Sequence, residues 1–265
     1  MKLAVITGAS SGIGAATARL LAAKGTEVVL VARSRSDLER VAGEIGDNAI
    51  VEVCDASDGE AVLTMAERIR RQHGIPDVIV NSAGAGAWDW IENTPPAEAA
   101  RMMQAPYLAA YNLTHAFMND LLARRSGVII HVNSPVSFAA WPGCTGYAAA
   151  RWALRGLHEA LCMDLWRTGV RSCEVVFGQV SSAYFERNAG ALERMPGIAR
   201  TVRTLSPAEC ARVIERVARR PRRQVVYPFM LRFYYWNYAV LPWVTRWLLR
   251  RTGVRHSPIE PSSEG

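Results

Sequence analysis

Lysine is almost absent from this sequence of 265 residues: Lys2 and Lys24 are its only lysines, beside 29 arginines. The formal net charge is +7, and ten of the arginines lie between residues 216 and 255, which leaves the N-terminal part close to neutral. Those arginines are interleaved with large apolar residues, a pattern that favours an anionic lipid surface over nucleic acid as a partner. The sequence contains no nucleic-acid-binding motif.

Cysteine pairs and metal-binding clusters are missing as well. The five cysteines are odd in number and widely scattered, without a CxxC spacing, and the five histidines have no metal-ligand spacing. These spacings imply neither a disulfide framework nor a zinc site, so we expect no metal and a reducing compartment. The apolar start KLAVI is too short for the core of a signal peptide. We therefore expect a cytoplasmic protein.

Short runs rich in Val and Ile alternate with helical patterns through most of the chain. Seven runs are predicted as strands: 3–6, 27–32, 49–53, 77–80, 127–132, 172–177 and 224–228. Helices are predicted near 12–24, 36–45, 58–73, 98–125, 147–168 and 207–219. Buried strands that alternate with helices form βαβ units. The pattern predicts an α/β fold with a single Rossmann-type, doubly wound parallel sheet of about seven strands and helices on both faces.

A glycine-rich stretch, TGASSGIG at 7–14, joins the first predicted strand to the first helix. Its glycines let the backbone turn sharply and let a pyrophosphate come close, while free N–H groups at the start of the helix favour anionic oxygens. A glycine pattern alone could be a simple turn. Its place between strand and helix predicts a dinucleotide site. The residues of this site are Gly8, Ser10, Ser11, Gly12, Ile13 and Gly14.

With its GxxxGxG spacing, the sequence resembles the short-chain dehydrogenase/reductase family. Asp55 stands where the family has an aspartate that contacts the adenine ring, and NSAG at 81–84 stands where it has NNAG. Ser134 precedes Tyr147 by thirteen residues, the family's spacing between its catalytic serine and tyrosine. FGQVSSAYF at 177–185 is similar to the segment that closes on the nicotinamide. The matching motifs cover residues 2 to about 228.

Charge at the end of the second strand indicates which cofactor binds. An acid there accepts hydrogen bonds from the ribose 2′-hydroxyl of NAD, whereas a basic residue pairs with the 2′-phosphate of NADP. The strand ends in Arg33, Ser34 and Arg35, with no acid before Asp37, so the sequence favours NADP (NADPH). Alternatively, these arginines are solvated loop residues. The resemblance implies further cofactor contacts at Asp55, Ala56, Asn81, Ala83, Gly84, Tyr147, Arg151, Gly178, Val180 and Ser181.

The resemblance also implies the chemistry, which is hydride transfer between the nicotinamide and a carbonyl or alcohol carbon. Tyr147 would be the acid in reduction and the base in oxidation, and Ser134 would hold the substrate oxygen. A phenol is a poor base at neutral pH unless a cation stabilises its phenolate. The family has a lysine four residues after the tyrosine, whereas this chain has Arg151. Arginine keeps the positive charge, but its flat fork differs from a compact ammonium.

A second departure lies in the long helix predicted at 98–125. The family has a catalytic asparagine where this chain has Pro106, which has neither a side-chain donor nor an N–H. Asn112 lies six residues later, and the role does not transfer to it. The rival interpretation is therefore a cofactor-binding sensor or scaffold without turnover. Retention of Ser134 and Tyr147 favours an enzyme.

The segment 229–256 extends beyond the minimal family domain and places aromatic residues beside arginines. Its longest apolar stretch is too short to span a bilayer. Trp, Tyr and Arg suit a membrane interface, which would place the protein at the inner face of a membrane; the alternatives are a lid over the substrate cleft and a subunit contact. In each case we expect a lipophilic carbonyl or alcohol substrate.

Three segments make up the predicted organisation. Residues 1–228 form the dinucleotide-binding and catalytic domain, 229–256 the helical extension and 257–265 a disordered tail. We expect a homodimer or homotetramer.

Overall fold

The structure of the chain is a computed structural model that describes residues 1–84, 86–181, 191 and 194–255. Three predictions fall partly or wholly outside these residues. They are the disordered tail at 257–265, the last residue of the extension at 229–256 and the second half of the segment 177–185.

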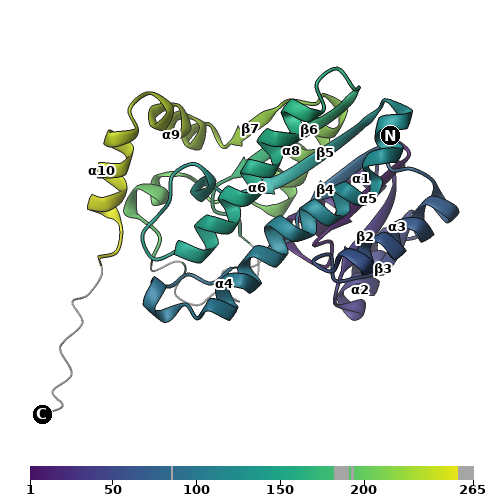
Figure 1. Ribbon diagram of the computed structural model, residues 1–265, viewed down its shortest axis with the longest axis horizontal. Coiled ribbons are helices and arrows are strands. Elements are labelled where there is room, and N and C mark those ends of the chain that lie inside the picture. The colour runs from purple at the N-terminus through teal and green to yellow at the C-terminus, as the bar shows by residue number, and fades with distance from the viewer. Residues whose placement is uncertain (85, 182–190, 192–193, 256–265) are drawn as a thin grey trace, which may run out of the picture.

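Seven parallel strands form a single sheet, in the order β3-β2-β1-β4-β5-β6-β7 (Figure 1). The strands are β1 (Leu3–Thr7), β2 (Glu27–Ala32), β3 (Ala49–Val53), β4 (Val78–Asn81), β5 (Gly127–Asn133), β6 (Val170–Phe177) and β7 (Gln224–Tyr227). This confirms the predicted fold class. Each predicted strand lies within two residues of an observed one, because buried parallel strands are short continuous apolar runs.

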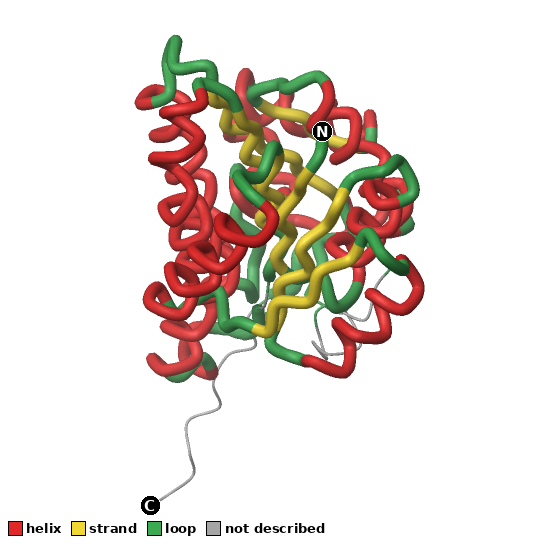
Figure 2. Tube along the Cα trace, turned by 90° about the vertical axis from the view of Figure 1, so that its right-hand side faces the viewer, coloured by secondary structure: helices red, strands yellow, loops and turns green. Residues whose placement is uncertain are grey.

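Helices cover both faces of the sheet, which lies between two helical layers in Figure 2. One face packs against α1 (Gly12–Ala22), α2 (Arg35–Ile45) and α8 (Pro207–Arg219) through side chains such as Leu21, Leu38 and Ile214. The other face packs against α3 (Gly59–His73), α5 (Ala109–Arg124) and α6 (Thr145–Asp164). Strand side chains alternate between these two cores, since successive residues point to opposite faces.

The stretch predicted as one helix at 98–125 is helical, but it is not one regular helix. It consists of α4 (Pro96–Met103), a π-helical turn at Gln104–Leu108 and α5. Pro106 lies in the wide turn and is buried. Proline has no N–H for the regular i→i−4 hydrogen bond, and its ring crowds the preceding turn. The helix accommodates Pro106 by widening at this point.

The chain order reverses between β1 and β4, which are neighbours in the sheet. From β1 the chain continues to β2 and β3 on one side, and from β4 to β5, β6 and β7 on the other. The connections therefore diverge above the carboxyl ends of β1 and β4 and leave a crevice there. In open α/β sheets this is where ligands bind.

The predicted extension forms two helices after β7, α9 (Phe229–Val240) and α10 (Pro242–Thr252), at one end of the molecule in Figure 1. Leu231 and Leu249 are buried against Phe138, Val176 and Val202 of the main domain. Within the described ranges, no helix has the length and apolar character needed to cross a membrane.

Candidate active site

A cavity of about 630 Å³ lies at the carboxyl ends of the strands. It is lined by residues of the segments that follow β1, β2, β3, β4, β5 and β6, together with residues of α6 and the π-helical turn. The predicted site residues that line it are Gly8, Ser10, Ser11, Gly12, Ile13, Arg33, Ser34, Asp55, Ala56, Ala83, Gly84, Ser134, Tyr147, Arg151, Gly178 and Val180. The structure thus gathers most of the predicted site at the reversal point of the sheet.

The glycine loop is shaped by close backbone contacts. Gly8 has φ +66°, which favours glycine, and a Cβ on Gly14 would lie 2.3 Å from the Gly8 carbonyl oxygen. Thr7 Oγ1 accepts hydrogen bonds from the backbone N–H groups of Ser82 (3.1 Å) and Ala83 (3.2 Å), joining the ends of β1 and β4. The loop leads directly into α1, and the backbone N–H groups at the start of this helix can bind anionic oxygens in the cavity.

Arg33 and Ser34 line the cavity after β2, together with Asp37. Ser34 caps α2: its Oγ accepts a hydrogen bond from the Asp37 N–H at 3.4 Å. Arg35 is not among the lining residues and pairs with Glu39 along the exposed face of α2. Of the two arginines that follow β2, Arg33 lines the cavity, whereas Arg35 is the first residue of α2 and does not.

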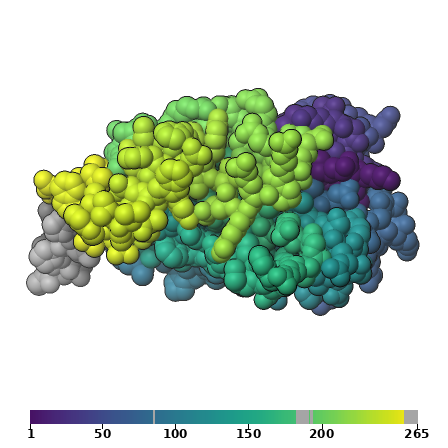
Figure 3. Space-filling view, turned by 90° about the horizontal axis from the view of Figure 1, so that it is seen from above, coloured from purple at the N-terminus to yellow at the C-terminus, as the bar shows by residue number. Residues whose placement is uncertain are grey.

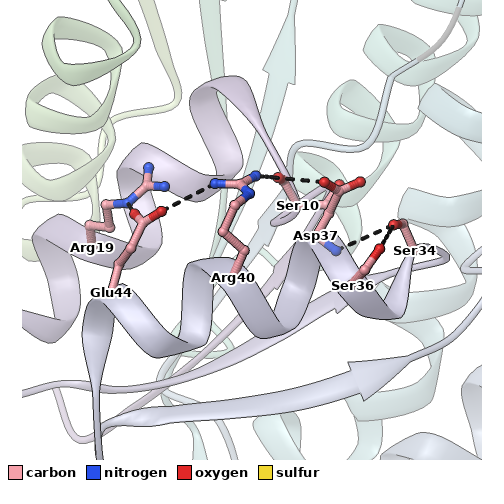
Figure 4. A network of polar contacts seen from close by, with 7 residues as sticks. All are labelled: Ser10, Arg19, Ser34, Ser36, Asp37, Arg40 and Glu44. Carbon is pink, nitrogen blue, oxygen red and sulfur yellow. Dashed lines mark hydrogen bonds and ion pairs between the residues drawn. The ribbon is translucent and has the colours of Figure 1, made fainter.

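A polar network connects α2 to the glycine loop (Figure 4). The Arg40 guanidinium donates to the Ser10 carbonyl oxygen at 3.1 Å and forms ion pairs with Asp37 (3.7 Å) and Glu44 (3.1 Å). The negative charge of Asp37 is therefore partly offset by a cation of its own helix. Sequence reasoning missed Arg40, which only the i,i+3 and i,i+4 spacing to the two acids could have suggested.

Asp55 follows β3, and its carboxylate accepts hydrogen bonds from the Ser57 N–H (3.0 Å) and hydroxyl (2.7 Å). Partial burial acts to raise the pKa of Asp55, but these hydrogen bonds and the charge of Arg33 outweigh it and lower the pKa below its usual value. The Asn112 side chain donates to the carbonyl oxygens of Ala56 (3.1 Å) and Ser57 (3.0 Å). Asn112 thus fixes the segment after β3 beside the cavity, but it does not itself line the cavity.

Three predicted cofactor contacts lie outside the cavity lining. Gly14 lies inside α1, against Gly8. Asn81 is buried at the end of β4, where its amide lies 3.3 Å from Thr114 Oγ1 and 3.3 Å from His131 Nδ1. Ser181 donates through its backbone and its hydroxyl to the Leu205 carbonyl oxygen. These residues shape the loops that contact the cavity.

Ser134, Tyr147 and Arg151 all line the same cavity. Ser134 follows β5, where its N–H donates to the Asn133 side-chain oxygen at 2.9 Å. Tyr147 and Arg151 lie in α6 one turn apart, so their side chains share a face. Both are buried, with exposed fractions of 5% and 8%. A Cβ on Gly86 would lie 2.3 Å from the Tyr147 ring, so glycine is needed for this packing.

The Arg151 guanidinium is held by the end of β5. Nη1 donates to the Val132 carbonyl oxygen at 3.0 Å, and the guanidinium carbon lies 5.1 Å from the centroid of the Tyr147 ring. A Cβ on Gly84 would lie 2.6 Å from Nη2, so the absence of a side chain there makes room for the fork. Within the described residues, the buried Nε has no hydrogen-bond partner. Such a donor is costly unless a bound ligand accepts from it.

Asn133 contacts both Ser134 and α6, and sequence reasoning missed it. Its amide donates to the Arg151 carbonyl oxygen (3.2 Å) and to the carboxylate of Glu174 (2.7 Å), while its own oxygen accepts from Ser134. Glu174 is fully buried in β6 and also accepts from Gln224 at 2.7 Å. The position of Asn133 directly before Ser134 was the available signal. Its partners, however, come from distant parts of the chain.

Aromatic and apolar side chains surround Tyr147 on the cavity side. The Trp88 ring lies 5.8 Å from the Tyr147 ring and 5.7 Å from the Trp141 ring, measured between centroids. Both tryptophans and Met195 line the cavity. Sequence reasoning did not identify these three residues, because they lie in loops without a recognisable pattern. Together they give this end of the cavity an apolar wall.

A model of the short chain dehydrogenase family matches residues 2–191. The chain is 29% identical over 200 residues to the 3-oxoacyl-(acyl-carrier-protein) reductase FabG of Haemophilus influenzae, covering 74% of this chain and 83% of the reductase. It is 34% identical over 231 residues to an uncharacterized oxidoreductase of Mycobacterium tuberculosis, covering 84% of this chain but only 65% of that protein.

Solved structures of dehydrogenases and oxidoreductases are also similar to this chain. An alcohol dehydrogenase from Thermococcus sibiricus, complexed with 5-hydroxy-NADP, matches with a TM-score of 0.74 and 28% identity over 86% of this chain and 96% of that chain. A metagenomic short-chain oxidoreductase in complex with NADP matches with a TM-score of 0.71 and 30% identity over 85% and 96%.

Proposed function

Because the chain belongs to the short-chain dehydrogenase/reductase family of nicotinamide-dependent oxidoreductases, we propose that it uses NADP to interconvert a carbonyl and an alcohol on a lipophilic substrate. One observation carries this proposal. Ser134, Tyr147 and Arg151 line the same cavity as the glycine loop and Arg33. A substrate oxygen and a dinucleotide would therefore meet within one cavity.

Several features of the cavity fit a dinucleotide. Gly8 and Gly12 line the cavity at the start of α1, where backbone N–H groups could meet a pyrophosphate. The Nε of Arg151, which has no partner among the described residues, is a donor that a ribose hydroxyl could satisfy. Arg33 faces the cavity where a 2′-phosphate would lie. The acid Asp37 also lines this part, but Arg40 pairs with it. Arg33 and Arg40 together favour NADP over NAD.

The proton chemistry follows from the positions of the side chains. When bound, the nicotinamide supplies or accepts the hydride. Tyr147 donates its phenolic proton to the carbonyl oxygen during reduction and removes the hydroxyl proton during oxidation. Ser134 orients that oxygen by a hydrogen bond. The charge of Arg151, held over the Tyr147 ring, stabilises the phenolate left after proton donation.

The apolar wall formed by Trp88, Trp141 and Met195 supports a lipophilic substrate. A second, smaller cavity of about 50 Å³ adjoins it and shares Pro135, Trp141, Gly178, Gln179 and Met195 with the first. Its other lining residues include Phe138, Val202, Leu231 and Leu249. An acyl or isoprenoid chain would fit this surface better than a sugar, because the lining offers few hydrogen-bonding groups. The similarity to a 3-oxoacyl reductase points the same way.

A carbonyl panel tests the proposal. Aliphatic aldehydes and ketones of increasing chain length are mixed with the protein and NADPH, and oxidation of NADPH is followed by absorbance. We expect turnover to rise with chain length, and Tyr147→Phe to lower it about 100-fold or more while NADPH still binds. If NADPH binds but no compound of the panel is reduced, the protein is a cofactor-binding sensor or scaffold instead.

A further inference from the structure

The two helices of the extension have strongly different faces. Toward the main domain, Leu231, Thr245 and Leu249 are buried, and Tyr234, Tyr235 and Tyr238 pack against the same core. Toward solvent, the side chains are large and apolar. Trp236, Trp243 and Trp247 are 58%, 69% and 56% exposed. Phe229, Met230, Phe233, Val240 and Leu241 are exposed beside them. We call these eight residues the aromatic face.

The aromatic face is unusual for a surface that only meets water. Exposed apolar residues are common when they are scattered singly, but a contiguous group marks an interaction site. On α9, Phe229, Phe233, Trp236 and Val240 follow one another at intervals of three or four residues and form a stripe along the helix. Trp243 and Trp247 are one turn apart on α10. Figure 3 shows the extension covering one end of the molecule.

Arginines accompany the aromatic residues. The Arg232 guanidinium lies 5.0 Å from the Phe229 ring centroid and 5.4 Å from that of Trp236, and Arg251 lies 5.9 Å from that of Trp247. From residue 229 to residue 255 the chain has five arginines and no aspartate or glutamate. The extension therefore has a net charge of +5, next to its apolar side chains, with no acid of its own to neutralise it.

We propose that the aromatic face docks on an anionic lipid bilayer, with α9 and α10 lying in the plane of the interface. Tryptophan rings favour the headgroup region, where their apolar surface is buried and their N–H can still be hydrated. Arginine stems can lie along the apolar boundary while the guanidinium groups reach phosphates. The proposal concerns binding alone, and its test does not depend on the proposed reaction.

A second copy of the chain is a poorer occupant for this face. A symmetric dimer through the aromatic face would bring the same five arginines of each copy close together, without an acid on either extension to pair with them. An anionic bilayer supplies the missing negative charge. Charge complementarity thus favours lipid.

Docking would also bring the bilayer close to the smaller cavity. Leu231, Tyr234, Thr245 and Leu249 line that cavity from the inner side of α9 and α10. The aromatic face lies on the outer side of the same helices, about 10 Å away, which is the diameter of a helix with its side chains. A lipophilic compound dissolved in the membrane would then need to pass only one layer of helix to reach the apolar end of the active site.

Vesicle sedimentation tests the proposal with the full chain. Phosphatidylcholine vesicles with and without phosphatidylglycerol are spun down, and the bound protein is quantified. We expect binding to the anionic vesicles at low salt, weakened at high salt because the charges are screened. Arg250→Gln with Arg251→Gln should lower the partition coefficient about 5-fold for each arginine. Trp243→Ser with Trp247→Ser should lower it about 10-fold or more.

Trp166 and Arg167 provide a matched control. Trp166 is as exposed as the tryptophans of the aromatic face, and Arg167 lies 5.9 Å from its ring centroid, but the pair lies after α6 and outside the extension. Trp166→Ser with Arg167→Gln should bind vesicles like the native chain. Circular dichroism and thermal unfolding verify that each variant is folded.

Three results would overturn the proposal. The first is failure of the folded chain to sediment with anionic vesicles at low salt. The second is an equal loss of binding in the Trp166/Arg167 control. The third is a dimer in light scattering that Trp243→Ser with Trp247→Ser converts to a monomer, which would identify a second copy as the occupant. A chain that reduces short soluble carbonyls but ignores vesicles would retain the proposed function and lose only this proposal.

Discussion

The Arg151 guanidinium carbon lies 5.1 Å from the centroid of the Tyr147 ring, over the face of the ring, while Nη1 is fixed to the Val132 carbonyl oxygen. A cation in this position interacts with the whole aromatic system. Because the negative charge of a phenolate is spread over the ring as well as the oxygen, the guanidinium stabilises the phenolate more than the phenol. Arginine can therefore supply, from above the ring, a positive charge at the position where the family pattern has a lysine.

Replacement of Arg151 tests whether its charge or its shape matters. We expect Arg151→Met to lower turnover about 10-fold or more at neutral pH, since it removes the charge and keeps much of the apolar stem. Arg151→Lys keeps the charge and can still donate to the Val132 carbonyl oxygen, so it should stay within about 10-fold of the native chain. If Arg151→Met turned over as fast as the native chain, the charge of Arg151 would have no role in stabilising the Tyr147 phenolate.

Cofactor affinity must be measured for the same variants by titration of the nicotinamide fluorescence. Arg151 lines the cavity, and the partner that its Nε lacks among the described residues is expected to come from the ribose. A weaker Kd alone would account for a lower rate at subsaturating NADPH. The comparison is therefore made at saturation.

Arg33 and Arg35 form a matched pair for cofactor selectivity. Arg33 lines the cavity, whereas Arg35 pairs with Glu39 on the exposed side of α2. Loss of a charge-assisted hydrogen bond to a phosphate costs about 1.5–3 kcal/mol, so Arg33→Ala should raise the Kd of NADPH about 10-fold to 100-fold. The Kd of NADH should hardly change. Arg35→Ala should leave both values as they are, and a similar loss there would argue against a specific 2′-phosphate site.

Gly14 and Gly43 are both helical, and they should respond oppositely to alanine. A Cβ at Gly14 would lie 2.3 Å from the Gly8 carbonyl oxygen, whereas a Cβ at Gly43 meets nothing within 4 Å. Gly14→Ala should cost about 1–3 kcal/mol and weaken NADPH binding, because the loop must move. Gly43→Ala should stabilise the fold by about 0.5–1 kcal/mol. Thermal unfolding measures both, and equal effects would mean that the tight loop contact is not formed.

His131 should make the fold sensitive to mild acid. Burial lowers the pKa of His131 to about 3, and the neighbouring His158 adds to the shift. An unfolded histidine titrates near pH 6.5, so protons bind more readily to the unfolded chain below that pH. The stability due to neutral His131 is complete above pH 6.5 and is lost as the pH falls toward 3.

Urea unfolding between pH 6.5 and 5 measures this loss. His131 contributes up to about 1.4 kcal/mol per pH unit. Carboxylates whose pKa is lowered by their partners, such as Glu215 beside Lys24, begin to lose their stabilisation only near pH 5, so the slope due to histidine is measured above that pH. His131→Leu should therefore reduce the slope of the unfolding free energy against pH, whatever it does to absolute stability. An unchanged slope would show that His131 is protonated in the folded protein.

Local sequence patterns predict most of the fold, because strand burial and helix periodicity are properties of neighbouring residues. The strand at 27–32 and the helix at 207–219 coincide with β2 and α8. The resemblance to the family picks out the glycine loop, Ser134 and Tyr147 by their spacing, and the structure places them in one cavity. The helix predicted at 98–125 failed only around Pro106, where a proline can end, kink or widen a helix with the same sequence signal.

Contacts between distant segments could not be predicted from such patterns. Asn133 joins Arg151 to Glu174 across 18 and 41 residues, and Trp88 packs on Tyr147 although the two are far apart in sequence. Asn81 is the reverse case: its motif predicts a cofactor contact, but the structure buries its side chain. Which loop residues face a cavity depends on the packing of the whole sheet.

The scarcity of lysine has a chemical consequence for the cavity. Lys2 and Lys24 are the only lysines of the chain, and neither lines the cavity where Arg151 stands beside Tyr147. A lysine side chain is a primary amine, which can lose its proton and condense with an aldehyde to form an imine. A guanidinium stays protonated and does not undergo this condensation. An aldehyde held against Tyr147 would therefore meet a guanidinium, and no lysine amine lines the described cavity to form an imine with it.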